Sequence, residues 1–274
     1  MLNPRVFRQQ LIIVIIFLFY FKVADAQQQT FGGTRINFLV DGHPGFVVQP
    51  PTSAPKGRKP WAWYAPTIGN YPNKSNVWLF ERLVQRGFWI CGMDVGESMG
   101  NPAGCRLFSM FYDTLMIKYH LDKKGCLIPQ SRGGLMLYNW AAEHPDSVAC
   151  IAGIYPVCNP GSYPGLKSAA GAYGMTEAQL AARLADHNPI DRLAPLAKAR
   201  VPIYHIHGDS DAVVPLDRNS GPLAQRYKEL SGEMTLNVVK GRGHDMWEGW
   251  FQCQALVDFV IAHAPKSGDA PPAK

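Results

Sequence analysis

Three short stretches of the sequence carry residue types that could perform nucleophilic catalysis together. Ser131 stands in Pro-Gln-Ser-Arg-Gly-Gly (129–134), Asp211 in His-Gly-Asp-Ser-Asp-Ala-Val-Val-Pro (207–215), and His244 in Gly-Arg-Gly-His-Asp-Met-Trp (241–247). A serine hydroxyl is a weak nucleophile at neutral pH, so it needs a histidine to take its proton and a carboxylate to orient that histidine. The chain offers these three groups in the order Ser, Asp, His.

The stretch around Ser131 predicts a sharp turn from a strand into a helix. Such a turn exposes the serine, and small neighbours let a substrate approach. The usual pattern is Gly-x-Ser-x-Gly, and Pro129, which is compact but has no N–H, replaces the first glycine. A serine at this place is by itself more commonly a helix N-cap. Its combination with Asp211 and His244 favours the nucleophile.

The acid and the base each follow a predicted strand near the end of the chain. Asp209 is an alternative to Asp211, although a carboxylate at that position also commonly caps the amides of a turn. A single histidine in a loop is more often a surface residue. Found in this order with a serine and an aspartate, His244 is the expected general base.

The segments that would position these residues alternate between strand and helix after a predicted hairpin at 36–50, whose turn residues are 41–45. Such alternation predicts a mostly parallel sheet with helices on both faces, and ligands bind outside the carboxyl ends of its strands. The predicted strands are 61–65, 88–94, 126–129, 148–155, 203–207 and 235–239, and the predicted helices are 77–86, 107–119, 133–144, 177–185, 222–230 and 247–263.

The His-Gly-x-x-Asp-x-x-Val-Pro loop around Asp211, with Ser131 and His244 in this order, resembles the α/β-hydrolase superfamily, in particular its dienelactone-hydrolase and prolyl-oligopeptidase-like branches. The resemblance covers the chain from about Trp61 onward. It implies an α/β-hydrolase fold, with a mostly parallel twisted sheet, helices on both faces and a small lid insertion. It also implies that Ser131 attacks a carbonyl, that His244 takes its proton and that Asp211 orients the histidine.

The oxyanion formed by this attack needs two hydrogen-bond donors. The resemblance implies the backbone N–H of Arg132 as one of them. The second would come from the loop after 61–65, where Pro66 has no N–H and Thr67, or Ile68, must donate. The Arg132 side chain is either a solvated group in the first helical turn or a further oxyanion donor, because the Ser-Arg pair is similar to that of glucuronoyl esterases.

Glu97 and Trp247 are candidates to bind a sugar or aryl group of the substrate. Glu97 follows the predicted strand 88–94, and Trp247 begins the last predicted helix, together with Trp250. A carboxylate and aromatic faces bind such groups well. The alternatives are a loop-capping role for Glu97 and core packing for the tryptophans.

The beginning of the sequence has the pattern of a secretory signal peptide. Arg5 and Arg8 precede an apolar run over 11–21, and cleavage is expected after Ala26. The run is shorter than the roughly 20 apolar residues that cross a bilayer, so we expect no stable membrane anchor after cleavage. We expect a secreted or periplasmic protein with a signal peptide (1–26), an α/β-hydrolase domain (27–264) with a lid insertion at about 159–199, and a flexible C-terminal tail (265–274).

The composition fits one domain that folds by itself. Of 274 residues, 47% are apolar and 18% are charged, and the formal net charge of +6 favours solubility. Lysines and arginines are scattered, so nucleic-acid binding is not expected. His205 and His207 alternate on one predicted strand without a third ligand nearby, so we expect core residues, no metal and no organic cofactor.

The sequence has six cysteines, and export makes disulfides possible. Cys91, Cys126 and Cys150 lie in strand-like runs, where buried thiols are expected. Cys158 and Cys253, at the start of a loop and within the last predicted helix, are the first candidate pair.

These observations predict a serine hydrolase that cleaves a carboxylic ester, including a carbohydrate-linked one, without a cofactor. One alternative is a prolyl-oligopeptidase-like peptidase, although such enzymes usually carry a large N-terminal gating domain. A dienelactone-type hydrolase ranks third, because that branch most often has cysteine in place of Ser131. A binding protein that kept the fold and lost catalysis is the alternative from another class, and Pro129 is the only argument for it. The oligomeric state stays open.

Overall fold

The computed structural model describes residues 28–52, 54 and 57–265. The predicted signal peptide (1–26) lies outside these residues, as does the predicted tail (265–274) except for Pro265. Within the described ranges, no helix is both long and apolar enough to cross a bilayer.

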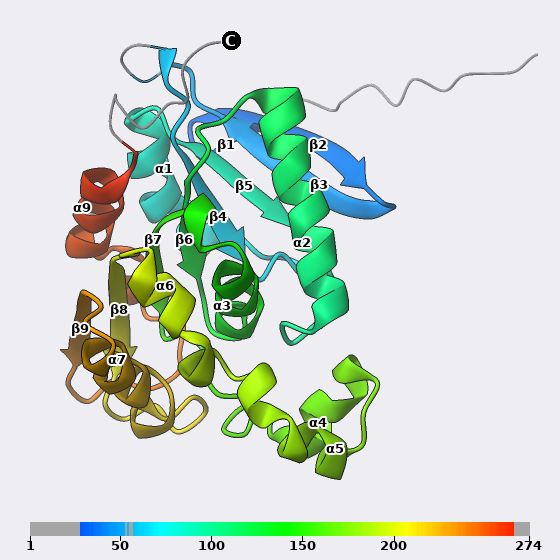
Figure 1. The fold of residues 1–274 in the computed structure, drawn as a ribbon. Coiled ribbons are helices and arrows are strands. Elements are labelled where there is room, and N and C mark those ends of the chain that lie inside the picture. Colours follow the sequence, from blue (N-terminus) through cyan, green and yellow to red (C-terminus); the bar gives the residue numbers. More distant parts are fainter. Residues whose placement is uncertain (1–27, 53, 55–56, 266–274) are drawn as a thin grey trace, which may run out of the picture.

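A single nine-stranded sheet runs through the described part of the chain, in the order β1-β2-β3-β5-β4-β6-β7-β8-β9 (Figure 1). The strands from β5 to β9 run parallel, and β1, β2 and β3 form an antiparallel edge, so the predicted mostly parallel sheet is confirmed. The strands are β1 (Gln28–Thr30), β2 (Gly33–Val40), β3 (His43–Gln49), β4 (Trp61–Ala65), β5 (Trp89–Met93), β6 (Gly125–Pro129), β7 (Val148–Ile154), β8 (Ile203–Gly208) and β9 (Met234–Val239).

The predicted hairpin is formed by β2 and β3, but its turn is tighter than expected. Only Asp41 and Gly42 make the turn, with φ of 49° and 78°, because His43 already pairs with Val40. Positive φ at both central residues is the turn geometry that matches the twist of a hairpin.

Helices cover both faces of the sheet, and each strand contributes to a core on each side because successive side chains point to opposite faces. Trp61 and Trp63 of β4 pack with residues of α2, α3, α6 and α7, whereas Ala62 and Tyr64 pack with residues of α1, α8 and α9. The helices are α1 (Val77–Gln85), α2 (Pro102–Thr114), α3 (Gly133–Glu143), α4 (Leu166–Ala170), α5 (Glu177–Ala182), α6 (Ala194–Lys198), α7 (Ser220–Glu229), α8 (Glu248–Phe251) and α9 (Gln254–His263).

Several predicted helices have different limits in the structure, and the largest differences are in α2 and in the closing helix. Helix α2 begins at Pro102 instead of 107, because the Asn101 side chain accepts the N–H of Gly104 (2.7 Å) and proline suits a first turn. It continues into a π turn over Leu115–Tyr119. The predicted closing helix is divided into α8 and α9, because the backbone is extended at Cys253 (φ −79°, ψ 99°).

The predicted insertion at 159–199 consists of α4, α5, α6 and short 3₁₀ turns. Figure 1 shows α4 and α5 projecting from the body of the protein beyond the carboxyl ends of the parallel strands. The 3₁₀ turns of the described chain are Lys74–Asn76, Pro145–Ser147, Gly171–Tyr173, Leu184–Asp186, Pro189–Arg192 and Leu216–Arg218.

The candidate pair Cys158 and Cys253 does not form a disulfide in the structure, because both thiols are free. Cys158 belongs to the core on the face of α2 and α3, and Cys253 packs on the opposite face, so the sheet lies between them. Cys91, Cys126 and Cys150 are fully buried free thiols, as expected.

Candidate active site

Ser131 follows β6 directly and has a backbone conformation that is unusual for its type. Its φ is 48°, in the left-handed region that side chains other than glycine seldom adopt. The end of β7 and the residues after it fix this turn, because the Ser131 N–H donates to Ile154 O (3.0 Å) and the Val157 N–H donates to Ser131 O (2.8 Å). Such an outlier persists only where the surrounding structure fixes it, and it is common at functional sites.

The two glycines after Arg132 are required by close packing. A Cβ atom at Gly133 would lie 2.0 Å from Ala65 O, and one at Gly134 would lie 2.2 Å from Val157 O. The start of α3 is therefore pressed against the ends of the strands beside β6. Pro129 is accommodated within β6, where it pairs with Ala65 of β4.

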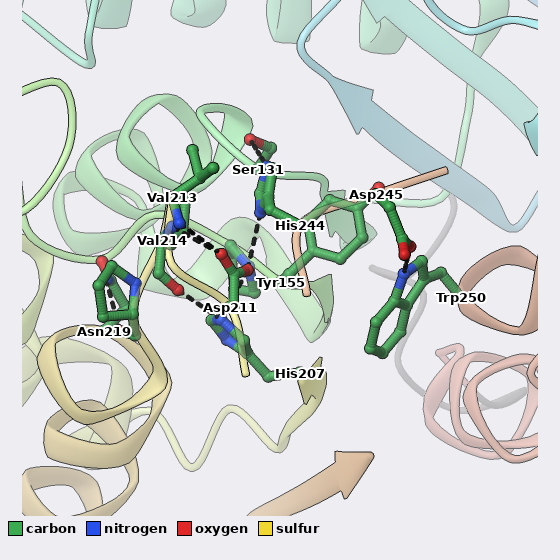
Figure 2. Close-up of polar contacts among 12 residues, drawn as sticks. Ser131, Tyr155, His207, Asp211, Val213, Val214, Asn219, His244, Asp245 and Trp250 are labelled. Carbon is green, nitrogen blue, oxygen red and sulfur yellow. Dashed lines mark hydrogen bonds and ion pairs between the residues drawn. The ribbon is translucent and has the colours of Figure 1, made fainter. Parts of the chain in front are cut away.

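Ser131, His244 and Asp211 lie in one hydrogen-bonded line (Figure 2). Ser131 Oγ is 2.9 Å from His244 Nε2, and His244 Nδ1 is 2.8 Å from Asp211 Oδ2. Because a carboxylate only accepts, the ring proton belongs on Nδ1, and Nε2 is left to accept the serine proton. Ser131 is therefore not the N-cap that its position also suggested, since its hydroxyl is directed to the histidine.

Asp211 is buried and held as a carboxylate by several donors. Its Oδ1 accepts the N–H groups of Val213 (3.0 Å) and Val214 (2.8 Å). Burial raises the pKa of Asp211, but hydrogen bonds from His207, His244 and the Val214 N–H outweigh burial and bring the pKa below its ordinary value. The carboxylate therefore stays ionised beside His244.

The alternative acid, Asp209, serves the loop instead. Its Oδ1 accepts the Ser210 hydroxyl (2.9 Å) and the Gly241 N–H (2.7 Å), and its side chain is exposed. These bonds fit the turn-capping role, and they leave Asp211 as the carboxylate in contact with His244.

Tyr155, the residue after β7, packs its ring against the His244 ring, with centroids 4.5 Å apart. It too has a positive φ, 34°. The Tyr155 hydroxyl accepts a hydrogen bond from Gln130 Nε2 (3.1 Å), and Gln130 Oε1 accepts one from the Tyr64 hydroxyl (2.6 Å). No motif in the sequence indicated Tyr155, although its place at the carboxyl end of a predicted parallel strand was a signal that could have done so.

A cavity of about 290 Å³ opens beside Ser131. Tyr163, from the predicted insertion, contributes to its wall, as do Tyr71 and Met246, which no sequence signal indicated. The cavity is lined by Pro66, Tyr71, Gln130, Ser131, Arg132, Tyr155, Tyr163, Val213, His244, Asp245 and Met246.

The predicted substrate residues Glu97 and Trp247 are not among these lining residues. Glu97 instead forms an ion pair with the Arg132 side chain. Trp247 lies under the Arg242 guanidinium (4.0 Å) and against the edge of Trp250, which is buried in the core.

Of the two predicted oxyanion donors, Arg132 lines the cavity and Thr67 does not. In the turn after Ser131, Gly133 donates to Gln130 O (2.8 Å) and Gly134 to Ser131 O (2.9 Å), so the Arg132 N–H remains as a first-turn donor. Thr67 follows the lining residue Pro66, and its hydroxyl donates to Tyr64 O (3.2 Å). Their role in binding an oxyanion stays a prediction.

The histidines of β8 are core residues. His205 and His207 are fully buried, and both contact the Ser220 hydroxyl. Within the part of the chain that the structure describes, no group of three or more His, Cys, Asp or Glu side chains could hold a metal ion.

No protein-family model and no curated protein matches this sequence. Solved structures match it in fold. An S-formylglutathione hydrolase from Agrobacterium tumefaciens is similar at 16% identity and a TM-score of 0.67, over 87% of this chain and 97% of that one. Est1E from Butyrivibrio proteoclasticus is similar at 16% identity and a TM-score of 0.63, over 84% of this chain and 98% of that one.

Larger proteins match over only part of their length. An acylaminoacyl peptidase from Pyrococcus horikoshii is similar at 16% identity and a TM-score of 0.68, over 88% of this chain but 43% of its own. Together these likenesses show that the chain has the α/β-hydrolase fold, as the sequence predicted.

Proposed function

We propose that this protein is a serine hydrolase that cleaves carboxylic esters through an acyl-enzyme. The observation that carries the proposal is the line from Ser131 Oγ to His244 Nε2 (2.9 Å) and from His244 Nδ1 to the buried Asp211 carboxylate (2.8 Å). The positive φ of Ser131 supports it, because strain of this kind is kept at functional sites. The inactive binding protein is disfavoured, because Pro129 leaves this geometry intact.

In the proposed reaction, Ser131 Oγ forms a bond to the ester carbonyl carbon while its proton passes to His244 Nε2. The carbonyl oxygen becomes an oxyanion, which the Arg132 N–H and the Thr67 N–H would bind. When the oxyanion collapses, the alkoxide leaves with the proton from His244 and the acyl group stays on Ser131. Water then repeats these steps and releases the acid. Asp211 stabilises the imidazolium throughout without taking the proton.

The preference for an ester over a peptide rests on the side chains that line the cavity. Tyrosine rings from three separate segments line the cavity, and they suit an aryl or sugar group next to the ester. A peptidase is the second candidate, because several peptidases share the fold. We also propose that the protein acts outside the cytoplasm, on the strength of its predicted signal peptide.

The test is reaction of the protein with a fluorophosphonate, followed by intact mass, together with hydrolysis of short-chain aryl esters, acetylated sugars and peptide anilides. Ser131→Ala is the control. We expect single labelling and ester turnover that both require Ser131. Turnover of peptide anilides alone would favour the peptidase, and folded protein with neither label nor turnover would refute the hydrolase.

A further inference from the structure

A chain of buried polar side chains runs from α3 to the carboxylate of Asp211. Tyr138 Oη is 2.7 Å from His205 Nε2, and His205 Nδ1 is 2.9 Å from Ser220 Oγ. The same Ser220 Oγ is 2.8 Å from His207 Nδ1. His207 Nε2 is 2.8 Å from Val214 O and 3.4 Å from Asp211 Oδ2 (Figure 2). All four side chains are almost fully buried, and the proposed reaction uses none of them.

The donors and acceptors in this series of hydrogen bonds fix the position of each proton in it. Val214 O and the Asp211 carboxylate only accept, so His207 Nε2 carries a proton. Burial, and then the nearby His207, lowers the pKa of His205 to about 3, so its ring has one proton and must accept at one nitrogen.

The direction of the remaining bonds follows from Tyr138. In the described part of the chain its hydroxyl has no partner but His205, so it donates to His205 Nε2. His205 Nδ1–H then donates to Ser220 Oγ, and the Ser220 hydroxyl donates to His207 Nδ1. The reverse order would leave the Tyr138 proton without an acceptor and would put a second proton on buried His207. Every donor therefore points toward Asp211.

We infer that Tyr138, His205, Ser220 and His207 form a one-directional hydrogen-bond relay that sets the effective charge of Asp211 and, through it, the affinity of His244 for a proton. These four are positioning residues that act through Asp211. The significance for catalysis rests on the proposed function, but the relay itself is a property of the fold.

The contact between the relay and the triad is at one atom. Asp211 Oδ2 faces both the His244 Nδ1–H (2.8 Å) and the His207 Nε2–H (3.4 Å), so the two donors compete for its negative charge. Hydrogen bonds in a chain polarise one another, so a donor to His207 Nδ1 makes its Nε2–H a stronger donor. If a bond of the relay is removed, more negative charge stays on Asp211 Oδ2, and the imidazolium of His244 is then better stabilised.

Other titratable and charged groups also face this pair. Tyr155, directly after β7, packs against the His244 ring, and Asp245 and Arg242 lie on the loop of His244 itself. Arg132, at the start of α3, is engaged by Glu97. The variants that cut the relay leave these groups in place.

The test is an NMR titration of the His244 ring in the full chain, comparing the wild-type protein with Ser220→Ala. We expect the midpoint of the His244 titration to rise by roughly half a pH unit, because removing the hydroxyl weakens the His207 donor. The matched control is Tyr227→Phe, which deletes a buried hydroxyl on the same helix, α7, that donates to Val201 O (2.6 Å). This control should lose stability with no change in the midpoint.

Tyr138→Phe removes only the far end of the relay and should move the midpoint in the same direction by less. The relay is refuted if the midpoint of the His244 titration does not move in folded Ser220→Ala. If only Tyr138→Phe folds, an unchanged midpoint in that variant refutes it. With an active enzyme, the acidic limb of kcat/KM should move together with the midpoint. The titration needs no substrate, so a moved midpoint in a protein without turnover would refute the proposed function and leave the relay intact.

Discussion

Replacing Asp211 by asparagine should nearly abolish the proposed ester hydrolysis without unfolding the protein. The amide oxygen must stay where Oδ1 now accepts the N–H groups of Val213 and Val214, because those donors need an acceptor. The amide NH₂ then takes the place of Oδ2, where it meets the Nδ1–H of His244 at a distance of 2.8 Å in the wild-type protein. Two donors cannot bond each other, so His244 shifts its proton to Nε2.

With a proton on Nε2, His244 can no longer accept the proton of Ser131 Oγ, which lies 2.9 Å away. The loss in kcat for a wrong tautomer of this kind is about 10⁴-fold, or about 5 kcal/mol of transition-state stabilisation. The assay is initial-rate hydrolysis of a short-chain aryl ester by Asp211→Asn, with thermal unfolding as the check of folding.

The matched control is Asp209→Asn in the same loop. Its amide oxygen can still accept from the Ser210 hydroxyl and the Gly241 N–H, so activity should stay within about threefold of wild type. The reasoning is refuted if Asp211→Asn keeps more than a tenth of the activity, or if Asp209→Asn shows the larger loss.

Three further predictions follow from the packing and charges. Gly133→Ala should remove fluorophosphonate labelling, because its Cβ would lie 2.0 Å from Ala65 O and displace the turn; unchanged labelling would contradict this. Because the pKa of Asp211 is lowered in the folded protein, its ionised carboxylate stabilises the fold fully above about pH 4, and this stabilisation is lost as the pH falls toward the folded-state pKa. The Tm of the wild-type protein should therefore exceed that of Asp211→Asn by less below about pH 4 than above it. Denatured, unreduced protein should react at all six cysteines with a thiol reagent, and a deficit of two would show that one disulfide forms, contrary to the free thiols of the structure.

The strand and helix pattern was readable from the sequence because it depends on local periodicity. Strand β4 has the limits predicted, and α1, α3 and β7 differ from prediction by one residue at their ends. The division of the closing helix could not be predicted from the sequence, because apolar spacing continues through Cys253 although the backbone is extended there.

The sequence by itself determined which residues follow the parallel strands, and hence that Ser131, Asp211 and His244 would meet at one edge of the sheet. This was possible because each motif is a short, local stretch tied to the end of a strand. Only the tertiary structure decided that Tyr71, Tyr155 and Tyr163 surround the cavity, that Glu97 pairs with Arg132, and that Ser220 joins two buried histidines. Such contacts join segments far apart in the chain, and their distances depend on how helices and loops pack over the sheet, which no local pattern records.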